Sequence, residues 1–141
     1  MEIRSCSESD YQEVYNLICE LEATQFDPGL FQIAFNSKLN NINCLFLVAV
    51  ENNSVIAFCG FTIDYHLHHA KKVAVIEELI VCSHHRGKGY GKQLLDRAIA
   101  IAKENNCDII ELTSGLDRDK AHEFYLKNGF TKSSFKFKKE L

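Results

Sequence analysis

The pattern of apolar and polar residues is most distinctive between residues 73 and 105. Residues 73–81 form an apolar run interrupted only by two acidic residues, which predicts a buried β-strand. Farther along, apolar residues recur with the spacing of one face of an amphipathic helix, at Leu94, Leu95, Ala98, Ile101 and Ala102. The chain is therefore expected to form a strand, a glycine-rich turn and a helix here.

The segment before this centre predicts two helices and three strands. A short strand is expected at residues 2–5, and strands at 44–50 and 55–65 are joined by a hairpin turn at 51–54. A second helix is expected to start near Leu30. The first helix has a broad apolar face, formed by Tyr11, Val14, Tyr15, Leu17, Ile18 and Leu21.

The segment after the centre predicts a strand at 108–113, a fourth helix ending at Asn128-Gly129, and a last strand at 135–138. In that last segment Phe and Lys alternate, so one face of the strand should be buried. This order of elements indicates an α/β fold of the α+β kind, with a mixed, largely antiparallel sheet and helices on both faces. Residues 1–141 should form a single domain.

Composition limits the classes of partner. With 25% charged residues and a net charge of −3, the chain lacks the basic surface typical of nucleic-acid-binding proteins. Its six cysteines are scattered without C-x-x-C spacing, which indicates reduced thiols in a cytoplasmic protein. No apolar run approaches the length of a membrane span, so no membrane partner is expected.

The turn between the central strand and its helix has the sequence Arg86-Gly87-Lys88-Gly89-Tyr90-Gly91, followed by Lys92. Glycines at alternate positions let the backbone curl around a ligand, and the first amides of the helix point into that curl. Together with the positive side chains, this arrangement suits a pyrophosphate. It is neither a P-loop nor a dinucleotide fingerprint. The alternative is a glycine-rich connection with solvated charges.

These residues resemble a known family. Two segments are similar to the two signatures of the GCN5-related N-acetyltransferases (GNAT). The first is Arg-Gly-x-Gly-x-Gly after a strand that contains Glu-Glu-Leu-x-Val, and the second is residues 121–130 downstream. The resemblance implies the GNAT fold, with six to seven strands and about four helices, and acetyl-CoA as cofactor. It places acetyl-CoA against the glycine-rich turn, the backbone of Ile80 and Val81, and Ser114.

Acetylation of an amine needs a group that takes its proton, because an alkylammonium stays protonated at neutral pH. Strand alternation predicts that Glu77 and Glu78 point to opposite faces of the sheet, and the family's usual base lies at one of them. Glu78 aligns better, while a structural ion pair with a lysine is the alternative. The resemblance assigns the general acid to Tyr125. Where the family often has Asn, this chain has Arg118.

Two further groups of residues are candidates for binding the acceptor. In the GNAT family the first two helices cover the acceptor pocket, which implies that substrate borders Phe26, Asp27, Phe31, Phe35 and Asn36. The alternative for these aromatic residues is packing. His66 and His68 would share a face of an extended strand, and with His69 they form a cluster that can chelate a divalent metal. A solvated hairpin end or a metal-free anion pocket explains the spacing equally well.

This histidine cluster, together with Phe35-Asn36 and the residues around Arg118, resembles one branch of the family, the bacterial aminoalkylphosphonate N-acetyltransferases. That branch is associated with dependence on a divalent metal. The sequence therefore predicts acetyl transfer from acetyl-CoA to a small primary amine, with an aminoalkylphosphonate as the preferred acceptor. The alternatives are a polyamine, an aminoglycoside or a protein N-terminus, or an acyl-CoA-binding module without catalysis. The oligomeric state stays open, with a homodimer among the options.

Overall fold

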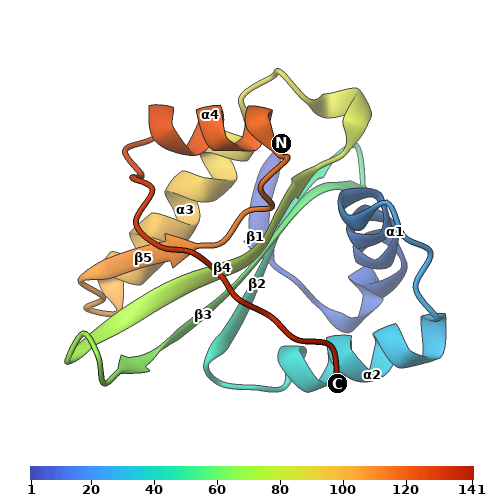
Figure 1. The fold of residues 1–141 in the computed structure, drawn as a ribbon. Helices are drawn as coiled ribbons and strands as arrows, with labels where there is room; N and C mark the ends of the chain where they lie inside the picture. Colours follow the sequence, from blue (N-terminus) through green and yellow to red (C-terminus); the bar gives the residue numbers. More distant parts are fainter.

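A computed structural model describes all of residues 1–141 and contains five β-strands and four α-helices (Figure 1). The strands are β1 (Glu2–Ser5), β2 (Cys44–Glu51), β3 (Ser54–His66), β4 (Lys71–Val81) and β5 (Ile109–Leu112). The helices are α1 (Tyr11–Glu22), α2 (Pro28–Leu39), α3 (Tyr90–Glu104) and α4 (Asp119–Lys127). Two short 3₁₀ turns, Glu8–Asp10 and Ser83–His85, precede α1 and follow β4. No helix is long and apolar enough to cross a bilayer.

The strands form one mixed sheet in the order β1-β2-β3-β4-β5. Neighbouring strands from β1 to β4 are antiparallel, and β5 runs parallel to β4. The hairpin between β2 and β3 turns at Asn52 and Asn53, whose φ angles of 51° and 63° fit the left-handed positions of a tight hairpin turn. The predicted mixed and largely antiparallel sheet is therefore confirmed.

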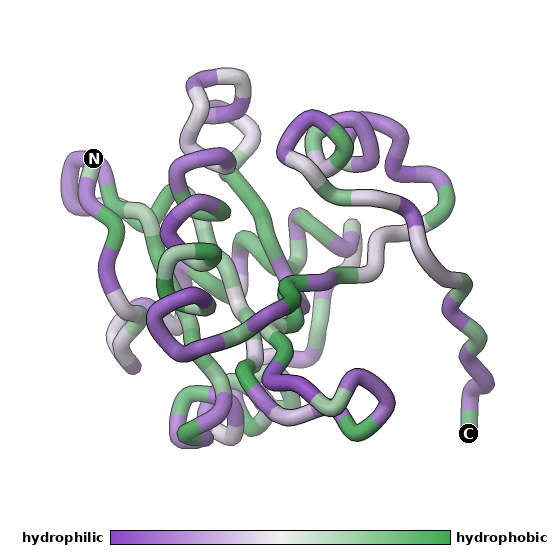
Figure 2. The backbone as a smooth tube through the Cα atoms, turned by 90° about the vertical axis from the view of Figure 1, so that its left-hand side faces the viewer, coloured by the Kyte–Doolittle hydropathy of each residue, from purple (hydrophilic) through white to green (hydrophobic).

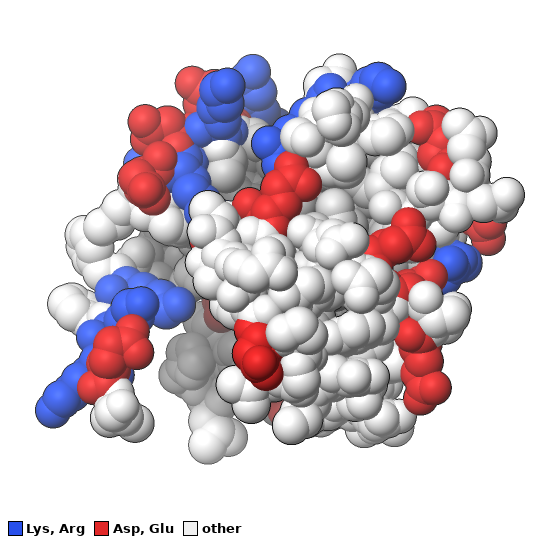
Figure 3. Space-filling model, turned by 90° about the vertical axis from the view of Figure 1, so that its right-hand side faces the viewer, with Lys and Arg blue, Asp and Glu red and all other residues white.

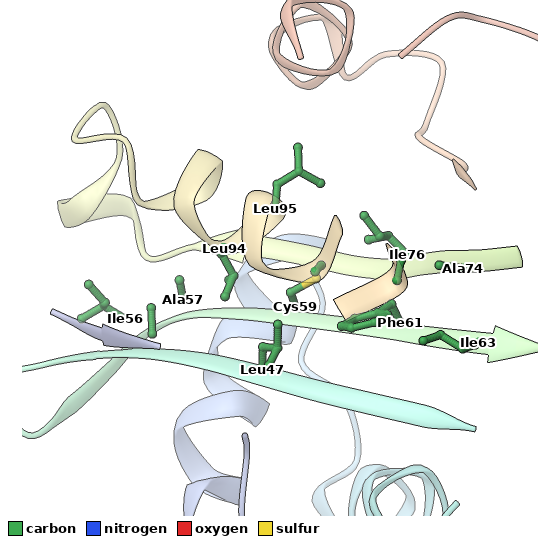
Figure 4. Packing of buried hydrophobic residues seen from close by; sticks show 13 residues of the cluster. Leu47, Ile56, Ala57, Cys59, Phe61, Ile63, Ala74, Ile76, Leu94 and Leu95 are labelled. Carbon is green, nitrogen blue, oxygen red and sulfur yellow. The ribbon is translucent and has the colours of Figure 1, made fainter. Parts of the chain in front are cut away.

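Helices cover both faces of the sheet, as the sequence predicted. On one face α3 packs its buried residues Leu94, Leu95 and Ala98 against alternate residues of β3, among them Cys59 and Phe61 (Figure 4). On the other face the buried core is formed by α1 and α2 together with Val48, Val55, Phe58 and Ile80. Figure 2 shows the result, with apolar colour concentrated in the central strands and mixed colour in the helices.

The predicted last strand is wrong. Residues 131–141 form no strand and are exposed throughout, and the sheet has five strands instead of six to seven. The alternation of Phe135 to Lys138 is typical of a strand with one buried face, but this segment pairs with no strand of the sheet. A strand needs backbone partners as well as the right side-chain period, so the pattern alone was insufficient.

Candidate active site

The glycine-rich turn lies where β4 gives way to α3. Gly87 and Gly89 have φ angles of 79° and 83°, a left-handed conformation that favours glycine. A Cβ atom built at either position meets nothing within 4 Å, so the loop is open at this point. Helix α3 begins with Gly89 as its N-cap and without a side-chain cap bond. Its first amides therefore remain available to an anionic ligand.

The basic side chains of the turn differ in how firmly they are held. The guanidinium of Arg86 donates to the carbonyl oxygen of Val81 and to Glu20, each over 3.0 Å, which ties the turn to β4 and α1. Lys92 pairs with Asp96 one helical turn away at 2.7 Å. Lys88 is exposed, as is Lys92. Arg86 thus shapes the loop, Lys92 is paired within its own helix, and Lys88 is exposed without an ion pair.

Strands β4 and β5 diverge beside this turn. Their last paired residues are Ile76 and Leu112, so β4 continues from Glu77 to Val81 without β5 alongside it. Ile80 and Val81 pair with β3 on one side, and their other side is open to an extended ligand. Ser114 lies half-buried in the loop that follows β5. The structure thus leaves an unpaired edge of β4 at the position where the pantetheine arm is expected.

A β-bulge changes the expected orientation of the two acidic residues of β4. Gly60 pairs with Glu78 and Phe61 pairs with Ile76, which leaves Glu77 as the extra residue. The prediction that Glu77 and Glu78 point to opposite faces is therefore wrong. Lys38 of α2 donates to Glu77 over 2.9 Å and also lies close enough to Glu78 to affect its titration. Both carboxylates belong to the face covered by α1 and α2.

The two carboxylates nevertheless have different environments. Glu77 is exposed and forms the ion pair with Lys38, which is the structural alternative considered for one of them. Burial raises the pKa of Glu78 to about 7, and the negative charge of Glu77 adds to this effect while Lys38 opposes it. A carboxylate that titrates near neutral pH is a stronger base than an ordinary one. Glu78 is thus the more buried of the two, and Glu77 is the one held in an ion pair.

Gly60 faces Glu78 across the bulge. The carboxylate of Glu78 occupies the space that a side chain at Gly60 would need. A Cβ atom at Gly60 would lie 2.5 Å from Glu78 Oε2 and 3.2 Å from the ring of Phe46. We expect Gly60→Ala to displace the carboxylate and lower kcat on the order of 10- to 100-fold. Steady-state kinetics of this variant should be compared with those of the wild type, and thermal unfolding should show that the variant is folded. A normal kcat for Gly60→Ala would mean that the position of this carboxylate is unimportant.

Tyr125 lies on α4. Its ring contacts those of Phe124 and Phe130, with centroid separations of 5.4 and 5.7 Å. Burial raises the pKa of the Tyr125 phenol, nearby Cys59 adds to the rise, and the charge of Arg118 opposes it. The phenol is therefore protonated at neutral pH and able to donate. Arg118 itself donates to the carbonyl oxygen of Leu21 over 3.2 Å, which joins the start of α4 to α1.

The residues expected to border the acceptor divide into two groups. Phe35 is only 4% exposed and packs against the rings of Tyr11 and Phe46, which supports the packing alternative for this residue. Asp27 caps α2 by accepting from the amide of Leu30 over 2.9 Å. The remaining residues, Phe26, Phe31 and Asn36, are half-buried or exposed on α2 and the connection before it.

The three histidines lie together at the hairpin between β3 and β4. One ring nitrogen from each of His66, His68 and His69 lies within 4.8 Å of the others. Sequence reasoning missed a fourth member, Glu111 of β5, whose carboxylate oxygens lie 3.9 Å from His66 Nδ1 and 3.7 Å from His69 Nε2. Only the register of β5 brings it here. The buried Nδ1 atom of His66 has no hydrogen-bond partner, which is unusual for a buried polar atom.

Comparison with known proteins identifies the family to which this fold and site belong. The profile of the acetyltransferase (GNAT) family matches residues 11–130. The chain is a GNAT-family protein. Among curated relatives, the aminoalkylphosphonate N-acetyltransferase of Salmonella typhimurium is 35% identical over 140 residues, which cover 99% of this chain and 91% of the relative. An uncharacterized N-acetyltransferase of Bacillus subtilis, YhdJ, is 31% identical over 94% of this chain and 93% of its own.

Solved structures agree with the GNAT fold. A protein described as a transcriptional regulator from Bacillus halodurans superposes with a TM-score of 0.91 and 26% identity over 99% of both chains. An aminoglycoside 6'-N-acetyltransferase from Acinetobacter haemolyticus superposes with a TM-score of 0.84 over 100% of this chain and 99% of its own, but at 22% identity it supports the fold alone. The family match and the curated relative together show that this GNAT protein is an N-acetyltransferase that acts on amines with acetyl-CoA as co-substrate.

Proposed function

We propose that this GNAT protein transfers the acetyl group of acetyl-CoA to a small primary amine, preferably an aminoalkylphosphonate. The observation that supports this most strongly is the half-buried Glu78, with a pKa of about 7, on the strand that leads into the open glycine-rich turn. The 35% identity to an aminoalkylphosphonate N-acetyltransferase over nearly the whole chain supports the choice of acceptor.

In the proposed reaction, Glu78 takes a proton from the bound alkylammonium, directly or through a water molecule. The neutral amine then attacks the carbonyl carbon of the thioester, and a new C–N bond forms as the C–S bond breaks. Tyr125 donates its proton to the leaving thiolate, whose thiol has a reference pKa of about 8.5. The first amides of α3, with Lys88 and Lys92, would hold the pyrophosphate of acetyl-CoA.

The proposal includes a divalent metal at His66, His68 and His69. When two ligand atoms bind one ion at about 2.0–2.1 Å, the two atoms lie roughly 3–4 Å apart. The carboxylate oxygens of Glu111 lie 3.7 and 3.9 Å from ring nitrogens of His69 and His66, which is in this range. Imidazole and carboxylate are suitable ligands for zinc, and the unpartnered Nδ1 of His66 is a free donor. A bound metal would offer a positive charge to the dianionic end of a phosphonate.

The acceptor and the metal can be tested together. We expect aminoethylphosphonate to be acetylated at least roughly 100-fold more efficiently than spermidine, measured as kcat/KM by release of the CoA thiol. Prior treatment with a chelator should remove this preference, and added Zn²⁺ or Mn²⁺ should restore it. Calorimetry should also show Zn²⁺ binding that is lost in His69→Ala and retained in the control His84→Asn. A preference for spermidine would exclude the proposed acceptor, and chelator-resistant activity would exclude the metal.

A further inference from the structure

A carboxylate of β2 contacts both ends of the glycine-rich turn. Glu51 is the last residue of β2, and its Oε1 accepts a hydrogen bond from the hydroxyl group of Tyr90 over 2.8 Å. Its Oε2 lies 3.4 Å from Nε2 of His85. His85 ends the 3₁₀ turn that precedes the loop, and Tyr90 is the first residue of α3. We refer to these three residues as the Glu51 network.

The Glu51 network spans the most deformable part of the turn. Between His85 and Tyr90 lie Gly87 and Gly89, both with left-handed φ angles and with open space beside them. Glycine loses more conformational freedom than any other residue when its backbone is fixed. A glycine-rich loop that nothing holds must therefore be ordered by its ligand, at a cost in affinity. Contacts at both ends of the loop reduce this cost because they order it in advance.

The side chains of the network are themselves well fixed. The ring of Tyr90 packs against the core beneath α3 and lies 6.2 Å from the ring of His85, measured between centroids. The hydrogen bond to Glu51 raises the pKa of Tyr90, so the phenol keeps its proton and remains the donor. The buried Nδ1 of His85 has no hydrogen-bond partner, and Glu51 is therefore the polar contact of this side chain.

The charge of Glu51 also points to a role in holding the loop. Figure 3 shows acidic and basic side chains close together along the top of the molecule, which is the end that carries the turn in Figure 1. A carboxylate near an anion site repels the anion unless nearby donors compensate its charge. Glu20 of α1 is compensated by Arg86 and by the amide of Ser83, at 3.0 and 3.2 Å. Glu51 is compensated in the same way by Tyr90.

We propose that Glu51 is a positioning residue for acetyl-CoA. Through Tyr90 and His85 it keeps the turn and the first amides of α3 in the conformation that binds a pyrophosphate. This inference rests on the proposed function, which places the pyrophosphate of acetyl-CoA in this turn. Because the network is proposed to act at the pyrophosphate and not at the acetyl group, its loss should raise KM for acetyl-CoA and leave kcat nearly unchanged.

A donor without the pyrophosphate provides the decisive test. Glu51→Ala should lower kcat/KM for acetyl-CoA roughly 10-fold, and kcat/KM for S-acetylpantetheine should stay at the wild-type value. Tyr90→Phe should give the same pattern, because it removes the hydroxyl group and keeps the ring in the core. Glu51→Gln should stay within about 3-fold of the wild type, since its amide oxygen can accept from Tyr90. The matched control is Glu104→Ala, which removes an exposed carboxylate at the other end of α3.

The two donors separate failure of this inference from failure of the proposed function. A wild type that uses both donors equally well would show that the turn does not bind the pyrophosphate, and would overturn the proposed cofactor site together with this inference. If the wild type prefers acetyl-CoA and Glu51→Ala keeps the same preference, the inference alone is wrong. An equal loss with both donors would likewise overturn it, because that result indicates a general loss of structure.

A double variant tests whether Glu51 and Tyr90 act through one contact. Calorimetry should give a Kd for acetyl-CoA in Glu51→Ala/Tyr90→Phe that is no weaker than that of the weaker single variant. Losses that multiply would show that the two residues act independently and would contradict the proposal. Thermal unfolding should show that each variant is folded. If Glu51→Ala does not fold, Tyr90→Phe with the two donors decides the question.

Discussion

Replacement of Glu78 with Gln should lower kcat for acetyl transfer by roughly 10²- to 10⁴-fold, which is the usual contribution of a general base. The amide keeps the size of the side chain but cannot accept the proton of the ammonium. The Kd of acetyl-CoA should change little, because the turn that is proposed to hold its pyrophosphate begins beyond β4. Stopped-flow or steady-state kinetics, together with calorimetry for acetyl-CoA, would measure both quantities.

The pH dependence of kcat/KM provides a second test of the role of Glu78. Burial and the neighbouring Glu77 raise the pKa of Glu78 to about 7, so the carboxylate becomes ionised as the pH rises through that value. The kcat/KM of the wild type should therefore increase with pH and level off above about 7 to 8. Glu78→Gln should lose this inflection. Glu77→Gln is the matched control, since it breaks the pair with Lys38 but leaves the buried carboxylate in place. A larger loss of kcat in Glu77→Gln would assign the base to Glu77 instead.

Replacement of Tyr125 with Phe should lower kcat by roughly 10²-fold, at the lower end of the range for general acid catalysis. The substitution removes only the hydroxyl group and keeps the ring contacts with Phe124 and Phe130. Because burial raises the pKa of the phenol, the wild type should remain active into the alkaline range, since Tyr125 keeps its proton there.

The control for this variant is Tyr65→Phe, because Tyr65 on β3 is 70% exposed. Thermal unfolding should show that Tyr125→Phe is folded as well as the wild type, which separates loss of the acid from loss of structure. If kcat of Tyr125→Phe equals that of the wild type, another group protonates the thiolate and the assignment of Tyr125 is wrong.

The elements with strong local signals were predicted closely. The hairpin at Asn52 and Asn53, the strand that precedes the glycine-rich turn and the amphipathic α3 were all found within a few residues of the expected bounds. The prediction of a strand at residues 135–138 was wrong, because their alternation is present but no strand pairs with them.

The sequence by itself determined the order of the elements, the glycine-rich turn and the residue types available for chemistry, because these depend on neighbours along the chain. Only the tertiary structure decided which of these residues meet. The bulge opposite Gly60 places Glu77 and Glu78 on one face, and the pairing of β5 with β4 brings Glu111 to the histidines. No local pattern encodes such contacts, because strand register and helix packing join residues that are tens of positions apart.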